Sequence, residues 1–567
     1  MSFHIDDNRQ SILDANGHLL IEGGPGSGKT TIALLKAKNL VEEDRLSKGQ
    51  QVLFLSFARA TLARVEEQAK KLITAEQKRK IEINTYHSFA WSLIKSFGYL
   101  LHQYERFQLI TPPNLFARMA HVETDDEREK FKENLLTNEG VICFDLFART
   151  AARIIEKSDR VCQLIAHKYP FIIVDEFQDT DRFEWKIIQS LGKYSKIIAL
   201  ADLNQRIFEF RGASITRIPE FDTHFSPQRV DFGLENNRSS NTDIVQFGDD
   251  LLTGKNIGKN YQNVEVVRYK FYQEPKLHLK AAISNSIKRI KKTAAGGEIS
   301  VAILVNSKDT TLQVSNYLAA NNFHHEVMID PEGPALSAAV IALLLQPLSE
   351  TENNVHALTT MLINHIKGRR GEKIAKKNLE LANHLESFVK TGKVKGPAKT
   401  ALVTEIGAIA GKRKQLLFNG IPEQDWLAVR RLFQNGQHEA IRHIYEDAQY
   451  IRLLNRGAVL SETLSEMWRS NGCYLNALNA VETALTQEHF AMANRKWNGI
   501  FVMNVHKAKG KEFDEVIIWE EKYKEIVYQS DKPGALQQSK LLLRVAVTRA
   551  RSRTTFLTPG WSPCILL

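Results

Sequence analysis

The stretch from Leu19 to Ala33, LLIEGGPGSGKTTIA, constrains the fold more than any other part of the chain. Its first residues, Leu19–Ile21, are apolar and predict a buried strand, and the pattern after Thr31 predicts a helix. The residues between them fit G-x-x-x-x-G-K-[ST], and a strand before and a helix after are the context that a phosphate-binding loop requires. The sequence therefore predicts a nucleotide-binding α/β domain.

The loop chemistry suits a nucleoside triphosphate such as ATP. Glycines let backbone N–H groups turn toward an anion, and the start of the helix adds a positive dipole end. Lys29 can reach the β- and γ-phosphates, and the Thr30 hydroxyl can hold Mg²⁺. The candidate nucleotide-binding residues here are Gly23, Gly24, Pro25, Gly26, Ser27, Gly28, Lys29, Thr30 and Thr31.

Composition favours a nucleic-acid partner and excludes some other classes. A formal net charge of +11 suits a polyanion, although a merely basic surface would give the same charge. Four widely separated cysteines without a C-x-x-C pair indicate neither a zinc site nor a disulfide framework. The N-terminal residues do not resemble a signal peptide, and no apolar run reaches membrane-spanning length. We expect a protein of the bacterial cytosol, with no membrane partner.

Strand and helix patterns alternate along the chain in two blocks, each interrupted by a helical segment. Apolar strand candidates of the first block include Val52–Ser56, Phe171–Val174 and Lys196–Ala201, and those of the second include Ile299–Val305 and Val516–Trp519. We expect a first α/β core at 1–93 plus 166–258, a helical insertion at 94–165, a second core at 259–350 plus 481–567, and a second insertion at 351–480.

Acidic residues follow the strand candidate Phe171–Val174 in the run DEFQDT. At the end of a strand beside a phosphate loop, Asp175 can hold Mg²⁺ through its water shell, and Glu176 can act as the general base for the attacking water. A surface-loop acidic cluster is the alternative, but the loop upstream favours the catalytic interpretation.

The segment after Lys196–Ala201 carries an amide and two aromatic rings. Gln205 can report the presence of a γ-phosphate. Phe208 and Phe210, followed by Arg211, suit stacking on unpaired bases with a cation beside them. Two phenylalanines at this spacing are more often core residues when no other motif accompanies them.

These motifs, in this order, resemble the UvrD/Rep/PcrA-type superfamily 1 DNA helicases over nearly the whole chain. Further segments carry the resemblance: Gln10, Ser56–Arg59, Thr85–Phe89, Leu234–Ser239, Val505–Phe513 and Val545–Arg551. The resemblance implies two RecA-like P-loop NTPase domains, each with a helical insertion. A smaller second insertion also resembles helicase subunits of phage-defence systems such as Gabija.

The resemblance also assigns roles to individual residues. At the ATP site, Gln10 reads the adenine, Glu512 belongs to the nucleotide-binding residues, Arg238 reaches the γ-phosphate and Arg549 is the arginine finger. Together with Lys29, Asp175, Glu176 and Gln205, the two arginines form the expected catalytic set. The expected DNA contacts are Phe57, Arg59, Thr85, His87, Phe208, Phe210, Arg211, His506 and Lys507.

The implied function is an ATP-dependent motor that moves 3′ to 5′ on single-stranded DNA and unwinds duplex, in DNA repair or phage defence. The alternative is an ATP-gated DNA-binding subunit that activates a partner nuclease and unwinds poorly by itself. Short helical insertions, of about 70 and 130 residues in 94–165 and 351–480, favour that alternative slightly.

Three positions depart from the family pattern. Asn237 replaces a tyrosine that stacks on adenine in relatives, and Ala201 replaces a glycine. Leu543 and Arg544 stand in a segment where relatives carry tyrosine and acidic residues, which puts part of the contact between the two cores in doubt. None of these departures removes an expected catalytic group.

Overall fold

The computed structural model describes residues 5–56, 59–101, 103–104, 106–207, 214–233, 235–270, 274–293, 299–328, 332–348, 351–369, 371, 374–394, 396–448, 459–490, 498–527 and 534–567. Internal contacts divide the chain into two compact units. The first contains Met1–Phe97, Ala148–Asp330 and Met492–Leu567, and the second contains Gly98–Phe147 and Pro331–Ala491. In the described part of the chain, no helix is long and apolar enough to cross a membrane.

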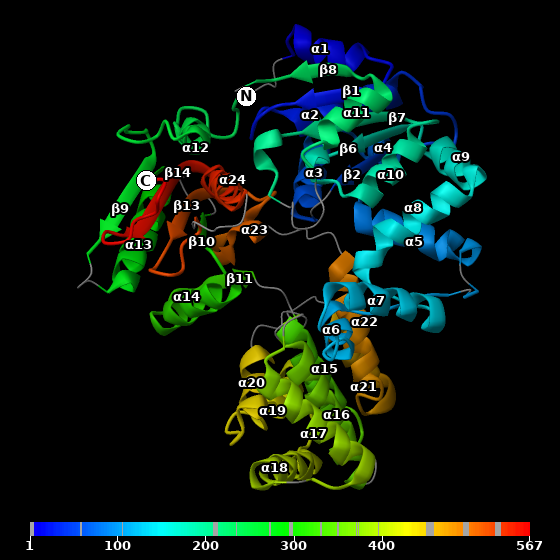
Figure 1. The fold of residues 1–567 in the computed structure, drawn as a ribbon, viewed down its shortest axis with the longest axis vertical. Helices are drawn as coiled ribbons and strands as arrows, with labels where there is room; N and C mark the ends of the chain where they lie inside the picture. The colour runs from blue at the N-terminus through cyan, green and yellow to red at the C-terminus, as the bar shows by residue number, and fades with distance from the viewer. Residues whose placement is uncertain are drawn as a thin grey trace. The chain divides into compact units, whose positions relative to one another are not determined.

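The first sheet of the first unit is parallel, with strand order β3-β2-β6-β7-β1-β8 among the described residues (Figure 1). Its inner strands are buried on both faces, as parallel sheets covered by helices require. The strands are β1 (Leu19–Glu22), β2 (Val52–Ser56), β3 (Ile81–Thr85), β6 (Phe171–Val174), β7 (Lys196–Ala201) and β8 (Gln228–Asp231). The accompanying helices are α1 (Asp7–Asp14), α2 (Lys29–Glu42), α3 (Arg59–Leu72), α4 (Ala75–Arg79), α5 (Tyr86–Phe97), α8 (Phe147–Lys157), α9 (Asp159–Lys168), α10 (Arg182–Leu191) and α11 (Arg217–Phe225), with short 3₁₀ turns η3 (Phe177–Asp179) and η4 (Leu203–Gln205).

The second sheet of the first unit is also parallel, with order β11-β12-β10-β13-β14-β9 in the described chain. The strands are β9 (Val264–Tyr269), β10 (Ser300–Val305), β11 (His325–Met328), β12 (Gly499–Asn504), β13 (Phe513–Trp519) and β14 (Ala550–Pro559). Its helices are α12 (Ile244–Thr253), α13 (Pro275–Thr293), α14 (Lys308–Ala320), α23 (Val505–Ala508) and α24 (Ala535–Val547). Two parallel sheets with helical connections confirm the predicted α/β fold class.

Parallel pairing brings the carboxyl ends of neighbouring strands to one edge of each sheet. Leu20 of β1 pairs with Ala199 of β7 on one side and with Arg229 of β8 on the other. The loops after β1, β6 and β7 therefore open at the same edge, where ligands of open α/β sheets bind.

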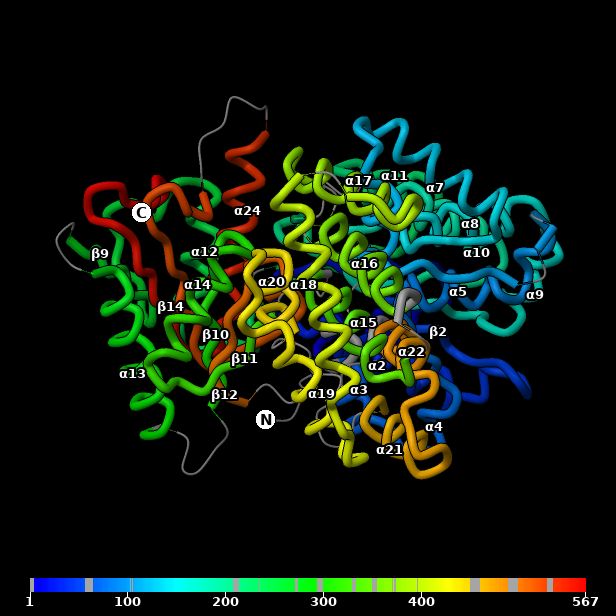
Figure 2. Tube along the Cα trace, turned by 90° about the horizontal axis from the view of Figure 1, so that it is seen from below, coloured from blue at the N-terminus to red at the C-terminus, as the bar shows by residue number. Residues whose placement is uncertain are grey.

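The second unit is mainly helical, and both predicted insertions contribute to it. Figure 2 labels its helices α15 to α22, coloured from green to orange. The apolar helix α15 lies in its core, packed against α6, α16, α19, α20 and α22. Gly368 is needed where α16 meets α6, because an added Cβ would lie 2.5 Å from the Pro113 carbonyl oxygen. The elements are η1 (Gly98–Leu100), β4 (Gln108–Leu109), α6 (Pro112–Arg118), α7 (Asp125–Glu139), β5 (Val141–Ile142), η2 (Phe144–Leu146), α15 (Glu332–Leu345), α16 (Thr351–Gly368), α17 (Lys376–Thr391), α18 (Pro397–Lys414), α19 (Pro422–Arg431), α20 (Glu439–Ala448), α21 (Val459–Asn471) and α22 (Ala477–Phe490).

The placement of helices α8 and α9 differs from the division expected from the sequence, which assigned residues 94–165 to the first insertion. They group with the first unit, where α9 packs on α10 and Cys162 Sγ donates to the Ser190 carbonyl at 3.1 Å. The four-segment division as a whole stays a prediction.

Candidate functional site

The phosphate loop lies between β1 and α2, as the sequence predicts. Gly28 is the N-cap of α2 and adopts a left-handed conformation, with φ 94°. Gly26 also has a positive φ, 81°, and an added Cβ there would lie 2.7 Å from Arg238 Cβ and 2.9 Å from the Arg238 backbone nitrogen. Both glycines are therefore required by backbone conformation, and Gly26 also by the close approach of the segment that carries Arg238.

Lys29 is held against the loop that it follows. Its Nζ donates to the carbonyl oxygens of Gly23 at 2.6 Å and Gly24 at 3.0 Å. Burial lowers the pKa of Lys29, while nearby carboxylates, that of Asp202 first, oppose the shift. The ammonium is thus positioned at the mouth of the loop and has partners that a phosphate can replace.

A cavity of about 260 Å³ opens beside the loop and receives groups from both sheets of the first unit. Besides most of the predicted nucleotide-binding set, it is lined by Gln68, Leu200 and Gly510, which the sequence interpretation did not single out. The lining residues are Pro25, Gly26, Ser27, Gly28, Lys29, Thr30, Thr31, Gln68, Asp175, Glu176, Leu200, Gln205, Asn237, Arg238, Gly510, Glu512 and Arg549. All six predicted catalytic residues therefore meet at one cavity.

The two candidate metal ligands fit a magnesium ion. Thr30, at the start of α2, and Asp175, directly after β6, are both buried and line the cavity. The described residues contain no group of three or more His, Cys, Asp or Glu that could hold a metal by itself. Magnesium in nucleotide sites is instead held by one or two protein oxygens together with substrate phosphates, so this donor set fits the ion.

Glu176 is held in a strained backbone conformation next to these ligands. Its φ is 53°, uncommon for a residue with a Cβ, and its Oε2 accepts from Gln178 Nε2 at 2.6 Å. Burial raises the pKa of the Glu176 carboxyl, but nearby cations, Lys509 and Lys29 first, outweigh burial and lower the net pKa. The carboxylate is therefore ionised at neutral pH and is available to orient water.

The next turn of chain fixes this acidic segment in place. Asp181 caps α10 by accepting from the backbone nitrogens of Phe183 and Glu184 at 2.7 and 2.8 Å. The Glu184 carboxylate in turn accepts from the Asp181 backbone nitrogen at 2.9 Å, which completes a capping box. A well-defined helix start thus anchors the DEFQDT run on its C-terminal side.

Arg549 and Gln205 connect the two sheets at the cavity. Arg549 follows α24, is 1% exposed and donates from Nη2 to Gln205 Oε1 at 2.8 Å. Gln205, in η4 after β7, in turn donates from Nε2 to Asp202 Oδ2 at 2.7 Å. An amide from the first sheet and a guanidinium from the second are therefore oriented by each other.

Arg238 and Glu512 form a second connection. Arg238 Nη2 lies 2.8 Å from Glu512 Oε1, and its Nη1 donates to the Thr548 carbonyl at 3.2 Å. Arg551 Nε lies 3.4 Å from the other Glu512 oxygen. The predicted nucleotide-binding carboxylate is thus the ion-pair partner of a predicted catalytic arginine.

A third connection, which the sequence interpretation missed, is the buried pair Lys509–Asp179. Lys509 Nζ donates to Asp179 Oδ2 and to the Gln205 carbonyl, the latter at 2.5 Å. Asp179 lies in the motif DEFQDT, and Lys509 lies in the motif VHKAKGKEF. Their membership of these motifs was the only sequence feature that could have indicated a role at the site.

Near the start of the chain, Arg9 contacts the phosphate loop, whereas Gln10 does not line the cavity. Gln10 is exposed, donates to Asp14 Oδ1 at 2.9 Å and is not among the residues lining the cavity. Arg9 is buried, and its Nη2 donates to Glu235 and to the Ser27 carbonyl, the latter at 3.4 Å. The adenine-reading role of Gln10 stays a prediction.

Asn237 lies in the cavity wall, and its backbone nitrogen donates to the Gly26 carbonyl at 2.9 Å. No aromatic side chain is among the described lining residues. Tyr261 is not among the lining residues; its hydroxyl donates to Asp250 Oδ2 at 2.6 Å, and its ring packs on Phe247.

The predicted DNA contacts are described only in part. Phe57, Phe208, Phe210 and Arg211 lie outside the described residues, as does the side chain of Arg59.

Four predicted DNA contacts are described: Thr85, His87, His506 and Lys507. Thr85 Oγ1 accepts from the Ser88 nitrogen at 3.0 Å and so caps the turn that begins α5, where His87 is half-buried. His506 and Lys507 lie on α23, half-buried, and burial lowers the pKa of His506. Their contact with DNA stays a prediction.

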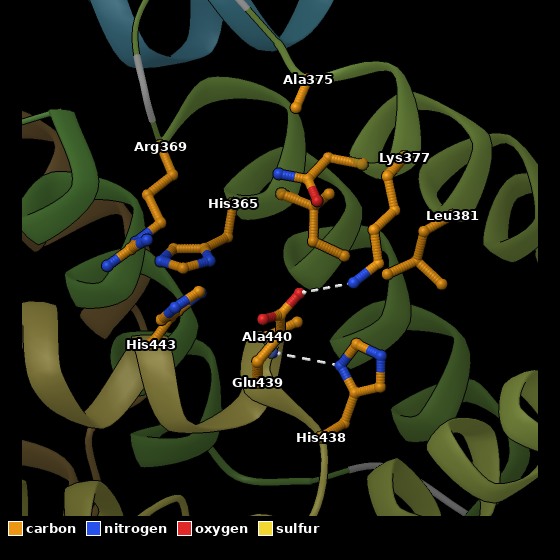
Figure 3. A pocket seen from close by; sticks show the side chains of 11 residues that line it. His365, Arg369, Ala375, Lys377, Leu381, His438, Glu439, Ala440 and His443 are labelled. Carbon is orange, nitrogen blue, oxygen red and sulfur yellow. Dashed lines mark hydrogen bonds and ion pairs between the residues drawn. The ribbon is translucent and has the colours of Figure 1, made fainter.

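A second cavity, also of about 260 Å³, lies in the helical unit among α16, α17 and α20 (Figure 3). Its cations are already compensated: Arg369 Nε donates to Asp447 at 2.7 Å, and Lys377 lies 3.4 Å from Glu439. Burial lowers the pKa of His443 to about 4, so this imidazole is neutral at pH 7. The lining therefore points to no particular ligand.

Known proteins resemble this chain over the segments that build the first cavity and both units. A model of the UvrD/REP helicase N-terminal domain matches residues 5–142 and 120–226, and a model of the UvrD-like helicase C-terminal domain matches residues 342–558.

Individual relatives are distant but extend along most of the chain. A probable DNA helicase II homolog of Rickettsia conorii is 20% identical over 96% of this chain and 91% of its own length. The ATP-dependent DNA helicase PcrA of Staphylococcus aureus is 20% identical over 96% of this chain and 81% of its own. Because the two family models together match most of the chain, this protein belongs to the UvrD-type superfamily 1 helicases, which are ATP-dependent DNA helicases.

Proposed function

We propose that this helicase moves 3′ to 5′ along single-stranded DNA, hydrolyses ATP with Mg²⁺ and uses the hydrolysis to unwind tailed duplex. The observation that carries the proposal is the convergence of groups from both sheets on one cavity: Lys29 and Glu176 come from the first sheet, and Glu512 and Arg549 from the second. The direction of movement rests on the family resemblance.

Four residues of the cavity have a proposed part in the chemistry of hydrolysis. Lys29 leaves the two carbonyl oxygens of its loop to meet the β- and γ-phosphates. Thr30 and Asp175 would hold Mg²⁺, whose charge offsets that of the phosphates. Glu176 orients and deprotonates the attacking water, which is consistent with a carboxylate kept ionised by neighbouring cations.

The connections between the sheets supply the proposed coupling to DNA. A γ-phosphate attracts Arg238 and Arg549 and so holds the two sheets together across the cavity. Hydrolysis removes that charge, and the cavity opens, as when switch segments are released by γ-phosphate loss. Alternating grip on the strand by the two cores would convert opening and closing into steps.

The remaining assignments are also proposals. The strand would be held by the nine predicted DNA contacts, with Phe208 and Phe210 stacking on bases. We place the four segments 1–93 plus 166–258, 94–165, 259–350 plus 481–567 and 351–480 as two RecA-like cores with their insertions. DNA repair and phage defence in the bacterial cytosol are the two settings that this activity suits.

The competing proposal is an ATP-gated DNA-binding subunit that activates a partner nuclease. The limited size of the first helical insertion favours it, since only Gly98–Phe147 from that part of the chain joins the helical unit. Such a subunit would retain the nucleotide site and DNA-stimulated hydrolysis, but it would displace strands poorly without its partner.

Strand displacement on 3′-tailed and 5′-tailed duplexes separates these proposals. Purified protein should displace the strand only from the 3′-tailed duplex, and only with ATP and Mg²⁺, while Glu176→Gln should displace neither. Displacement from the 5′-tailed duplex alone would refute the direction. DNA-stimulated ATPase without displacement from either substrate would favour the regulatory subunit.

A further inference from the structure

Arg544 is buried in a helix that is otherwise apolar at this point. It lies in α24, is 2% exposed and has the fully buried neighbours Leu543 and Val545. A guanidinium in such surroundings destabilises the fold unless it is paired and hydrogen-bonded.

The Arg544 guanidinium contacts two separate elements. Its Nε donates to Asp249 Oδ1 of α12 at 2.7 Å, and its Nη1 donates to the Asn204 carbonyl of η4 at 3.2 Å. The same Nη1 lies 3.9 Å from Asp202 Oδ2. The rigid fork of an arginine is suited to span acceptors in this way, and the single ammonium of a lysine is not.

Close packing keeps this arginine in place. Helices α12 and α24 approach each other at Gly248, the residue before Asp249, where an added Cβ would lie 3.3 Å from Arg544 Cγ and 3.2 Å from Thr548 Cγ2. Both helices pack in the core that covers one face of the second sheet. Arg544 therefore joins the second sheet's helices to η4, which follows the first sheet's strand β7.

Two of the three residues that contact the Arg544 guanidinium, Asn204 and Asp202, belong to the segment that orients Gln205. Asp202 accepts from Gln205 Nε2 at 2.7 Å and from the Asn204 nitrogen at 3.0 Å, and Gln205 Oε1 accepts from Arg549 at 2.8 Å. The Asp202 backbone nitrogen donates to Gln178 Oε1 at 3.0 Å, and Gln178 Nε2 donates to Glu176 Oε2 at 2.6 Å. A continuous set of hydrogen bonds and charges thus runs from Arg544 to both ends of the candidate γ-phosphate site.

We propose that Arg544 is a positioning residue for γ-phosphate recognition. Its charge fixes the Asp202 carboxylate and the η4 backbone, which hold the Gln205 amide with its oxygen toward Arg549. Gln205 and Arg549 then reach the γ-phosphate together. This inference rests on the proposed roles of Gln205 and Arg549 and names the residue that keeps the two in register in this chain.

The test is the preference of the protein for a γ-phosphate. Affinities for ADP and for adenylyl imidodiphosphate, an ATP analogue that is not hydrolysed, are measured on full-length wild type, Arg544→Lys and Asp249→Asn. The analogue-to-ADP preference should fall about tenfold in both variants, as loss of a charge-assisted hydrogen bond of about 1.5 kcal/mol would give. The affinity for ADP should stay unchanged, because ADP has no γ-phosphate, whereas a general folding defect would weaken both ligands.

Two further variants make the result decisive. Arg413→Met removes another buried arginine, one that donates to α15 carbonyl oxygens in the helical unit, and it should keep the wild-type preference. Arg549→Ala tests the assumption beneath the inference: a wild-type preference in Arg549→Ala would refute the proposed arginine finger itself. Wild-type preference in both Arg544→Lys and Asp249→Asn, with loss in Arg549→Ala, would overturn the positioning role alone.

Discussion

Replacing Gly26 by alanine separates backbone strain from a steric effect on Arg238. The backbone at Gly26 has φ 81°, and a Cβ would lie 2.7 Å from Arg238 Cβ, 2.8 Å from Asn236 Oδ1 and 2.9 Å from the Arg238 nitrogen. The two Arg238 atoms that the new Cβ would meet are its Cβ and its backbone nitrogen. Neither can swing away as the end of a flexible side chain can, so the backbone around Arg238 must move. Gly49 provides a matched control, because its φ of 88° is similar but an added Cβ would meet nothing within 4 Å.

The expected magnitudes follow from these contacts. Alanine in the left-handed region costs about 1–2 kcal/mol of stability at either position. Only Gly26→Ala should also displace Arg238 from Glu512 and the Thr548 carbonyl, bonds of 2.8 and 3.2 Å. Misplacing one charge-assisted interaction worth about 1.5–3 kcal/mol predicts a loss of about 10- to 150-fold in kcat/KM for ATP.

The assay combines thermal unfolding with ATPase kinetics on single-stranded DNA. Both variants should melt at similarly reduced temperatures, whereas kcat/KM should fall in Gly26→Ala, toward the value of Arg238→Ala, and stay near wild type in Gly49→Ala. If Gly26→Ala and Gly49→Ala hydrolyse ATP equally well, the close approach at Gly26 does not position Arg238 and the reasoning is refuted.

Four further outcomes are expected. Lys29→Ala should weaken ATP binding, whereas Glu176→Gln should bind ATP but not hydrolyse it, because one residue meets phosphate in the ground state and the other acts on water; nucleotide-binding titration with ATPase assays checks this. Phe210→Ala should weaken single-stranded DNA binding by about 1–3 kcal/mol in anisotropy titrations, and unchanged affinity would return Phe210 to the core. Asn237→Tyr should lower the KM for ATP with little change in kcat, because a ring would stack on adenine in ground and transition states alike; an unchanged or raised KM would contradict this. Burial raises the pKa of Glu520 from 4.5 to about 7, so the folded carboxyl keeps its proton where the unfolded one has lost it, and stability falls as pH rises between those values. Glu520→Gln should therefore raise the melting temperature at pH 8, with a free-energy gain of up to about 3 kcal/mol that shrinks as pH falls toward 5.

The parts of the fold that depend on local pattern were predictable. Strands such as Val52–Ser56 and Phe171–Val174 coincide with β2 and β6, because parallel strands buried on both faces appear as continuous apolar runs. Two edge strands, β8 and β11, gave no such signal. In β8 only Val230 is buried, and all four residues of β11 are partly exposed, so neither strand carries an apolar run.

Most residues that line the cavity beside the phosphate loop were named from the sequence, but their pairings were not. The glycine-rich loop and the acidic run identify themselves by composition and order. Lys509–Asp179 and Arg544–Asn204, however, join residues more than 300 positions apart, and their contact depends on how the two sheets dock. Spacing along the chain does not encode that docking. The sequence therefore showed Arg544 only as a departure from the family pattern, and not as the partner of Asn204 and Asp202.

The pairings change how nucleotide binding to this helicase should be understood. Each cation assigned to phosphate already has an internal acceptor: Lys29 has the Gly23 and Gly24 carbonyls, Arg238 has Glu512, and Arg549 has Gln205. ATP must therefore exchange these bonds for phosphate bonds, so the net affinity gained per contact is far smaller than the gross interaction. In the proposed cycle, a γ-phosphate takes over Arg238 from Glu512 and Arg549 from Gln205 and becomes the bridge between the two sheets in their place. Because each of these two pairs joins the first sheet's residues to the second's, we expect the same exchange that limits affinity to give the γ-phosphate its proposed control over the contact between the cores.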